Sequence, residues 1–165
     1  MWIDVLNEAD WPAVRAIYEE GLATGVATFE TEAPAWDDWN RGHLESCRLA
    51  ARAESNPGKL RLLGWAALSP VSRRAVYRGV AEVSIYIAAA ARGQGVGKGL
   101  LQELIAQSEA AGIWTLQSSI FACNAPSLAL HRACGFREVG RRERIAQRDG
   151  IWHDTVLLEL RSSKT

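Results

Sequence analysis

A glycine-rich loop between an expected strand and an expected helix is the feature that most constrains how this chain folds. Residues Val80–Ile87 are rich in apolar and β-branched side chains, which predicts a strand. Leucines at helical spacing predict a helix from about Lys98 to Ala111, which Gly112 ends. The amides in the first turn of a helix have no internal partner, and the helix dipole favours an anion beside them. The segment between the two elements therefore predicts a phosphate site.

The glycine spacing narrows the kind of phosphate site. A Walker A loop fails because Gly97-Lys98 is followed by Gly99, and the GxGxxG dinucleotide pattern fails as well. The pattern that fits is R-x-x-G-x-G from Arg92 to Gly97, in which glycines let the main chain approach phosphate oxygens. The alternative is a glycine-rich helix start that only permits tight packing. The residues expected at the phosphates are Arg92, Gly93, Gln94, Gly95, Val96, Gly97 and Lys98.

The rest of the chain alternates expected strands with expected helices. Asp10 and Pro34 each stand at the start of a helical pattern, a third helix runs from Asn124 to Gly135, and Asn56-Pro57-Gly58 reads as a turn. The apolar side of the second helix is expected to carry Trp36, Trp39, Leu44 and Cys47. The expected strands lie at residues 2–6, 60–68, 77–87, 114–121, 136–142 and 152–160. This order predicts an α/β fold in one domain, residues 1–165, with helices on both faces of a mixed sheet.

The charge and cysteine content argue against several kinds of partner. Lys plus Arg and Asp plus Glu number 19 each, so there is no basic excess for binding nucleic acid. The local cluster Arg141, Arg142 and Arg144 is expected to be a solvated strand edge. Three cysteines without CxxC spacing predict reduced, buried thiols rather than disulfides or a zinc site. No apolar run approaches the ~20 residues that span a bilayer, and the acidic N-terminal segment does not read as a signal peptide.

A second motif follows the expected strand at 114–121. The segment Asn124–Phe136 reads N-A-P-S-L-A-L-H-R-A-C-G-F, and together with the 92–97 loop it resembles the GNAT superfamily of N-acetyltransferases. The resemblance covers nearly the whole chain and implies a central, mostly antiparallel sheet with acetyl-CoA as co-substrate. Asn124 can equally cap the short helix, and the two roles are compatible. The further residues that the resemblance places on the cofactor are Ile85, Tyr86, Ile87, Asn124 and Ser127.

Three shorter segments resemble one branch of that superfamily, the phosphinothricin and methionine sulfoximine or methionine sulfone N-acetyltransferases. They are Thr28–Thr31, Tyr77–Tyr86 and Gly150–Asp154, whereas the 69–76 connection lacks an aromatic residue that some relatives carry. The branch implies a small zwitterionic acceptor, a homodimer and a cytoplasmic location. An acceptor carboxylate suits arginine, which offers a rigid fork of donors. The expected acceptor contacts are Phe29, Glu30, Arg74, Tyr77 and Arg78.

Two residues are the expected proton carriers of this chemistry. An ammonium must lose a proton before it attacks a thioester, and Glu82, in an apolar strand, is the expected base; the alternative is an ion pair with an arginine such as Arg78. His131 stands where many relatives have tyrosine and is expected to protonate the departing thiolate, unless it only packs against the sheet. Direct transfer needs no metal and no thiol nucleophile, so Cys123 is expected to be a buried thiol.

These observations predict an acetyl-CoA-dependent enzyme that acetylates an amine of the methionine sulfoximine, methionine sulfone or phosphinothricin type. Two alternatives stay open. One is a GNAT enzyme that acts on a protein or peptide amine, which calls for an open groove. The other is a coenzyme A-binding sensor without catalysis, which would keep the 92–97 loop but would not need Glu82.

Overall fold

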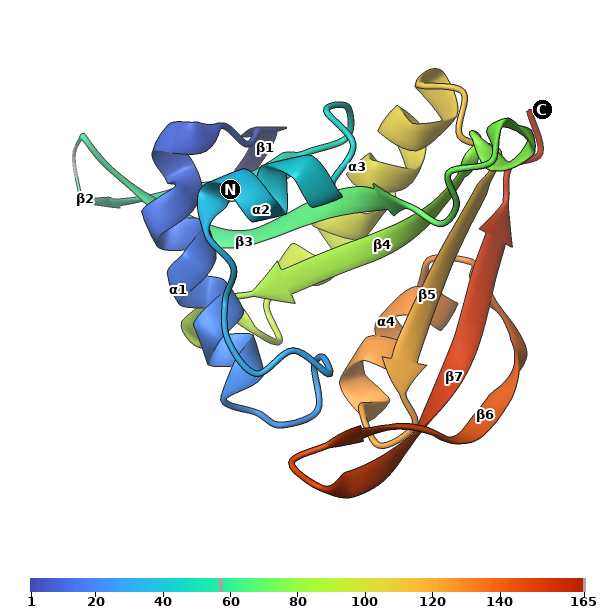
Figure 1. The fold of residues 1–165 in the computed structure, drawn as a ribbon. Coiled ribbons are helices and arrows are strands. Elements are labelled where there is room, and N and C mark those ends of the chain that lie inside the picture. Colours follow the sequence, from blue (N-terminus) through green and yellow to red (C-terminus); the bar gives the residue numbers. More distant parts are fainter. Residues whose placement is uncertain (57, 165) are drawn as a thin grey trace.

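The computed structural model describes residues 1–56 and 58–164, and within them seven strands form one sheet in the order β1-β2-β3-β4-β5-β7-β6 (Figure 1). Neighbouring strands are antiparallel except for β4 and β5, which are parallel. The predicted mixed, mostly antiparallel sheet is confirmed. The strands are β1 (Trp2–Val5), β2 (Leu49–Asn56), β3 (Lys59–Pro70), β4 (Val80–Ile87), β5 (Thr115–Phe121), β6 (Arg137–Arg148) and β7 (Ile151–Arg161).

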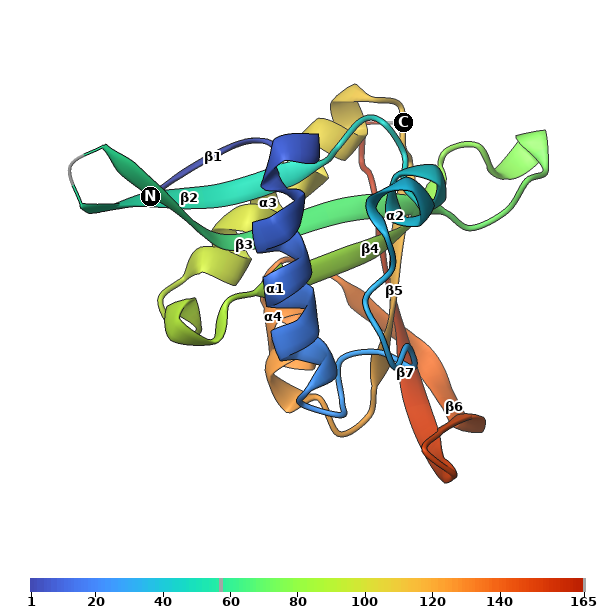
Figure 2. The ribbon, with the colours of Figure 1, turned by 60° about the vertical axis from the view of Figure 1, so that its left-hand side comes forward.

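Helices cover both faces of the sheet, as the sequence predicts (Figure 2). On one face lie α1 (Trp11–Leu22) and α2 (Trp36–Gly42), and on the other lie α3 (Val96–Ala110) and α4 (Ala125–Ala133). Three short 3-10 turns, η1 (Glu8–Asp10), η2 (Ala75–Tyr77) and η3 (Ala89–Ala91), connect these elements.

Each face of the sheet has its own hydrophobic core. Leu100 and Leu104 of α3 are fully buried against apolar side chains of β2 to β5. Under α1 and α2 the core is aromatic: Trp65 of β3 stacks on Tyr86 of β4 at 4.8 Å between ring centroids, and Tyr18 of α1 lies 4.7 Å from Tyr86. Burying one such side chain stabilises the fold by about 1.5–3 kcal/mol, so these two cores fix the helices onto the sheet.

Strands β4 and β5 are paired over only three residues, from Val80–Thr115 to Glu82–Gln117. Beyond Glu82, β4 continues along β3 and β5 continues along β7, so the two strands diverge and the sheet opens (Figure 1). The edge of β4 that faces β5 therefore has main-chain groups without a strand partner from residue 83 to residue 87.

Two elements differ from the sequence prediction. The second helix ends at Gly42, so Leu44 and Cys47 lie after it, and the chain turns at Cys47 (φ 62°) into β2, which the sequence did not predict. The alanines and charged residues of β2 have low strand propensity, so pairing with β1 and β3 decides its conformation. The fourth strand begins at Val80 rather than Tyr77, because residues 75–77 form η2. The turn expected at residues 56–58 includes Pro57, which lies outside the described residues.

The β6–β7 hairpin projects from the body of the molecule (Figure 2). Its turn is Asp149-Gly150, with φ of 51° and 76°, the conformation that a two-residue hairpin connection requires. Strand β6 is the edge of the sheet, and Arg141, Arg142 and Arg144 are exposed on it, as predicted.

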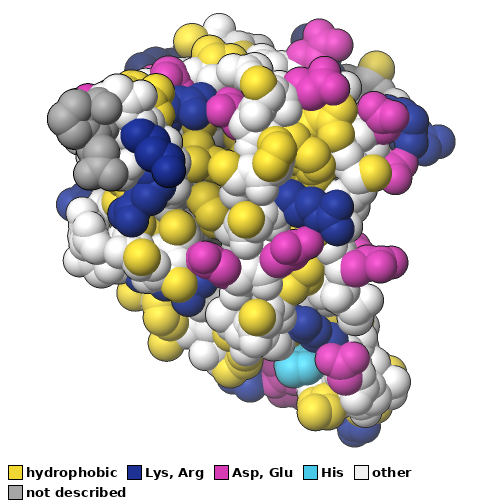
Figure 3. Space-filling model, turned by 90° about the vertical axis from the view of Figure 1, so that its left-hand side faces the viewer, with side chains coloured by type: hydrophobic (Ala, Val, Ile, Leu, Met, Phe, Trp, Pro, Cys, Tyr) yellow, Lys and Arg dark blue, Asp and Glu magenta, His cyan; other side chains and the backbone are white. Residues whose placement is uncertain are grey.

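Charged side chains of both signs are interspersed over the face shown in Figure 3, with hydrophobic side chains between them. This distribution agrees with the equal numbers of acidic and basic residues. Among the helices in the described part of the chain, none has the length and apolar character needed to cross a bilayer.

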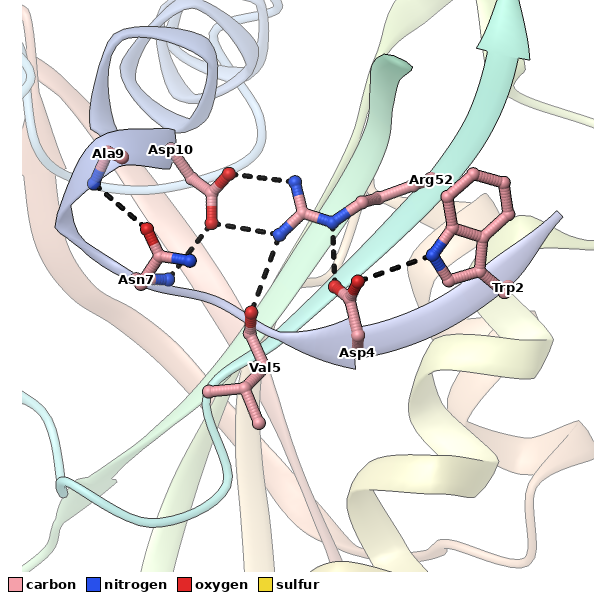
Figure 4. A network of polar contacts seen from close by, with 7 residues as sticks. All are labelled: Trp2, Asp4, Val5, Asn7, Ala9, Asp10 and Arg52. Carbon is pink, nitrogen blue, oxygen red and sulfur yellow. Dashed lines mark hydrogen bonds and ion pairs between the residues drawn. The ribbon is translucent and has the colours of Figure 1, made fainter. Parts of the chain in front are cut away.

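Arg52 of β2 ties the N-terminal segment to the sheet (Figure 4). Its Nη1 and Nη2 donate to the two carboxylate oxygens of Asp10 at 2.7 and 2.9 Å, and its Nε donates to Asp4 at 2.7 Å. Asp10 also accepts the Asn7 amide at 2.9 Å, which closes a capping box at η1. The hydrogen bond from Arg52 is the main cause that holds the pKa of the Asp10 carboxyl below its ordinary value of 3.8.

Asp10→Asn is expected to lower the free energy of unfolding at neutral pH by about 2 kcal/mol, since it removes a charged partner from a largely buried guanidinium. Because the folded-state pKa of Asp10 is lowered, its contribution is present above its unfolded-state pKa and is lost as the pH falls through the folded-state pKa. Urea unfolding should therefore show the difference between variant and parent shrinking as the pH approaches about 3.

Asp4→Asn is the matched control for this prediction. The Asp4 side chain is 45% exposed, against 15% for Asp10, so its loss should cost less than about 1 kcal/mol. A difference between Asp10→Asn and parent that stayed constant down to acid pH would contradict the assigned ion pair.

Candidate active site

A cleft of about 730 Å³ opens where β4 and β5 separate. This volume lies within the range of small-molecule sites, about 300–1,000 Å³. Its walls come from the end of α1 and the loop after it, from β4, from the glycine-rich loop, from β5 and from one side of α4. The divergence of two neighbouring strands thus creates a cleft large enough for a small molecule.

The glycine-rich loop forms a helix start that faces open space. Helix α3 begins at Val96, two residues earlier than predicted, and Gly95 precedes it in the left-handed conformation, with φ of 80°. Gly93 has φ of 73°, and a Cβ built on either glycine would meet no atom within 4 Å. The first-turn amides of α3 lack an intrahelical acceptor and are accessible to an anionic group.

Two side chains of the glycine-rich loop donate hydrogen bonds to main-chain carbonyls just before it. Arg92 donates from Nε to the Ile87 carbonyl at 3.2 Å, and Gln94 donates from Nε2 to the Ala90 carbonyl at 2.8 Å. Arg92 and Lys98 are exposed and line the cleft, where they add positive charge to the amides. This end of the cleft suits a phosphate group.

Glu82 lies at the point where β4 and β5 part. Gln117 donates from Nε2 to Oε2 of Glu82 at 2.5 Å, and the Ser119 amide donates to Oε1 at 2.8 Å. Both donors belong to β5, so they hold the carboxylate across the opening of the sheet, where Glu82 lines the cleft. The guanidinium of Arg78 lies instead over the Trp114 ring, 5.4 Å from its centroid, and no ion pair between Arg78 and Glu82 exists within the described residues.

His131 of α4 lines the same cleft and is 1% exposed. Its Nδ1 lies 2.8 Å from the Ser127 carbonyl oxygen, which can only accept, so Nδ1 carries the hydrogen and Nε2 carries the lone pair. Nε2 is buried, and no partner for it is found in the part of the chain that is described. Burial lowers the pKa of His131, so the imidazole is neutral at neutral pH and offers an acceptor rather than a proton.

The loop after α1 supplies a further wall of the cleft. Asn124 donates from Nδ2 to the Val26 carbonyl at 3.2 Å and accepts the Ser127 amide on Oδ1 at 3.2 Å, so it holds the loop and caps α4. The Phe29 ring lies 4.4 Å from Phe121 and 6.1 Å from His153. This part of the cleft is therefore aromatic, in contrast to the phosphate-type end.

Most of the residues predicted from the sequence meet at this cleft. Those that line it are Phe29, Glu82, Ile85, Tyr86, Ile87, Arg92, Gly93, Gly95, Val96, Gly97, Lys98, Asn124, Ser127 and His131. Five predicted residues are not among the lining residues: Glu30, Arg74, Tyr77, Arg78 and Gln94. Arg74, Tyr77 and Arg78 lie on the exposed connection between β3 and β4, where Arg74 covers the Tyr77 ring at 5.5 Å. Arg74 and Arg78 therefore stack on aromatic rings of their own chain.

Sequence reasoning did not find Gln117 and Ser119, the two partners of Glu82. No local signal identifies them, because the pairing of β4 with β5 brings them there. The prediction of a buried Cys123 is wrong, since this thiol is exposed and lines the cleft directly after β5, whereas Cys47 is buried and Cys134 is half-buried. Within the described residues no group of three or more His, Cys, Asp and Glu side chains is arranged to hold a metal ion.

Comparisons with known proteins agree with this geometry. The profile described as "Acetyltransferase (GNAT) family" matches residues 11–136, so the chain belongs to the GNAT family of acetyltransferases, enzymes that use acetyl-CoA. The phosphinothricin N-acetyltransferase of Alcaligenes faecalis is 37% identical, over 95% of this chain and 80% of the relative. The L-methionine sulfoximine/L-methionine sulfone acetyltransferase of Pseudomonas aeruginosa is 30% identical, over 95% and 92%.

Solved structures show the same fold. A phosphinothricin acetyltransferase from Sinorhizobium meliloti in complex with acetyl-CoA has a TM-score of 0.85 and 29% identity, over 99% of this chain and 91% of that chain. A ribosomal-protein-alanine N-acetyltransferase from Brucella melitensis has a TM-score of 0.86 and 29% identity, over 98% and 100%. The predicted GNAT fold is therefore confirmed, and relatives with small-molecule and with protein acceptors share it.

Gly95→Val is expected to weaken acetyl-CoA binding at least about tenfold, measured by titration calorimetry, because a β-branched residue is strained at φ of 80° and its side chain occupies the space before the first-turn amides. Gly112→Val is the matched control: Gly112 has φ of 79°, an equally open Cβ position, and stands at the other end of α3. The control should lose similar stability and still bind acetyl-CoA like the parent. Unchanged affinity of Gly95→Val would contradict the phosphate-loop assignment.

Proposed function

We propose that this GNAT acetyltransferase transfers the acetyl group of acetyl-CoA to the amino group of a small amino-acid-like acceptor of the methionine sulfone, methionine sulfoximine or phosphinothricin type. The observation that carries the proposal is the convergence of three features at the opening between β4 and β5: a phosphate-type helix start, an unpaired strand edge and the Glu82 carboxylate. The acceptors named for the relatives from Alcaligenes faecalis and Pseudomonas aeruginosa support this class.

In this proposal acetyl-CoA occupies the cleft, with its diphosphate at the start of α3 and its thioester near Glu82. Acetyl-CoA supplies a thioester whose carbonyl carbon takes up the amine and whose sulfur departs as thiolate. The first-turn amides of α3, with Arg92 and Lys98, hold the diphosphate. The free edge of β4 from Ile85 to Ile87 would pair with the amide-bearing arm as an added strand does, and one of its N–H groups would stabilise the oxyanion.

Glu82 activates the acceptor by taking one proton from its ammonium group. The hydrogen bonds from Gln117 and Ser119 hold the carboxylate in a fixed orientation, which general base catalysis requires. The amine nitrogen then forms a bond to the acetyl carbon, and the carbon–sulfur bond breaks.

His131 carries the second proton. An ammonium group has three hydrogens and the amide product keeps one, so two protons must leave the nitrogen: one goes to Glu82 and the other to the sulfur. Because neutral His131 presents a lone pair on Nε2, it first accepts this second proton and then donates it to the departing thiolate. This order reconciles its expected role as donor with its neutral resting state.

The two alternative functions make different demands on the same site. An enzyme for a protein or peptide amine needs a groove that admits a chain, whereas the 24–29 loop here is tied to the start of α4 through Asn124 and forms a wall of the cleft. A coenzyme A sensor has no need of a carboxylate held by two donors at the opening of the sheet. Both observations favour a small-molecule acetyltransferase.

The branch resemblance also leads us to propose a cytoplasmic homodimer. Val76 and Tyr77, beside Arg74 and Arg78, are exposed on the β3–β4 connection and are available for such a contact. Light scattering on the purified protein would give the mass directly, and a monomer at every concentration would reject the dimer.

Glu82→Gln is expected to lower kcat by about 10²–10⁴-fold and to change the pH dependence of the rate, while the acetyl-CoA dissociation constant stays within about twofold. The amide keeps the size of the side chain and can still accept the Ser119 N–H, so the effect reports the lost base. Glu159→Gln is the control, because Glu159 faces Gln117 from β7 and pairs with Arg137 at the surface. A Glu82→Gln variant with the parent's rate would remove Glu82 as the base.

Thiol release from acetyl-CoA across a panel of amines tests the acceptor class. Methionine sulfone, methionine sulfoximine and phosphinothricin should give turnover at least about tenfold above that with a peptide that begins with alanine. Preference for the peptide would establish the protein-acceptor alternative. Tight coenzyme binding without turnover on any amine would establish the sensor.

A further inference from the structure

The Arg148 side chain is a buried cation beside the aromatic part of the cleft, which Phe29 lines. It is the last residue of β6, directly before the Asp149-Gly150 turn, and its side chain is 9% exposed. Nη2 donates to the Leu22 carbonyl at 2.8 Å, and Nη1 donates to the Thr28 carbonyl at 3.1 Å. One guanidinium therefore joins the β6–β7 hairpin to the end of α1 and to Thr28 in the loop that follows it.

The charge of Arg148 is offset mainly by these carbonyl groups. The carboxylate of Asp149 lies 3.6 Å from Nε but is 72% exposed, and Nε is buried with no hydrogen-bond partner found in the described residues. The Leu22 carbonyl belongs to the last turn of α1, where the helix dipole favours a cation. If the loop moved away from the end of α1, the buried guanidinium would lose the Thr28 acceptor, so Arg148 opposes movement of this segment.

The segment that Arg148 holds is part of the cleft wall. Thr24 and residues 26–29 line the cleft, and Phe29 contacts both Phe121 of β5 and His153 of β7. Asn124 holds the Val26 carbonyl from α4. Arg148 is thus the charged member of a set of contacts that fix an otherwise irregular loop against the hairpin.

We propose that Arg148 is a positioning residue that holds the 22–28 segment, and with it Phe29, in the conformation that receives the acceptor. The inference rests on the proposed function in one respect, namely that this wall faces the acceptor. A planar fork can reach two carbonyls at fixed separation, whereas a lysine ammonium on a flexible stem holds them less firmly. Replacing Arg148 by lysine therefore keeps the positive charge but should hold the loop less firmly.

The test compares Arg148→Met, Arg148→Lys and the control Arg144→Met. Arg144 is an exposed residue of the same hairpin whose guanidinium lies over Trp152 at 5.5 Å. Hydrogen exchange of amides 24–29 is measured without ligand, together with acetyl-CoA affinity and, with methionine sulfone as acceptor, kcat and KM. In Arg148→Met we expect loop exchange and acceptor KM to rise about tenfold, with kcat and acetyl-CoA affinity within about twofold of the parent. For Arg148→Lys, loop exchange and acceptor KM should lie between those of the parent and of Arg148→Met. For Arg144→Met, both should match the parent.

Three results would overturn the inference. Loop exchange equal to the parent's in both Arg148 variants would show that Arg148 does not hold the segment. A uniform rise over the whole chain would show general destabilisation, and Arg148→Lys decides this point if Arg148→Met does not fold. If the acceptor KM and the acetyl-CoA dissociation constant rose by the same factor, Arg148 would have no specific role in positioning the acceptor. If the parent does not turn over methionine sulfone, the proposed acceptor fails by itself, and the exchange measurement still decides whether Arg148 holds the loop.

Discussion

The early separation of β4 from β5 is the constraint on which the rest of the site depends. A parallel pair that continued past Glu82 would satisfy the main-chain groups of both strands and leave no space between them. Instead, β4 follows β3 and β5 follows β7, and each strand turns an edge toward the cleft. On β5, the Ser119 amide that a neighbouring strand would have used donates to the Glu82 carboxylate. The contacts that hold the Glu82 carboxylate, the cleft and the free strand edge are therefore consequences of one change in strand pairing.

The chemistry divides along the cleft according to which elements form each part. A helix start is fixed by regular backbone geometry, so α3 can present amides and a dipole to an anion with little help from side chains. The wall on the other side is irregular chain after α1, which has no strand or helix ladder to hold it. Side chains from three other elements hold it instead: Asn124 before α4, Phe121 of β5 and Arg148 of β6. The phosphate-type end of the cleft is thus built from backbone, and the aromatic end from side-chain contacts.

The same division explains what could be predicted from the sequence. The glycine-rich loop, α3 and β4 have strong local patterns that predicted these elements, whereas the expectation that Glu82 and His131 belong to the site also drew on the family resemblance. Strand β2 was missed because its alanines and charged residues carry no strand signal, and only pairing on both sides makes it a strand. Gln117 could not be found because the register of a pair 35 residues apart brings it to Glu82. Arg74 and Arg78 were expected to bind an acceptor carboxylate because arginine suits that group, whereas they flank η2 and stack on Tyr77 and Trp114.

The protonation state of His131 depends both on local spacing in the sequence and on tertiary packing. His131 follows Ser127 by four residues in α4, and one helical turn therefore brings its Nδ1 to the Ser127 carbonyl, a contact fixed by local spacing. That contact alone sets the tautomer but not the charge. The charge is set by burial, which comes from packing of α4 against the sheet and against Phe136, 5.0 Å away, and which lowers the pKa of the imidazole. A histidine in the same motif on an exposed helix would be largely free to protonate, and it would then offer a proton where this site offers a lone pair.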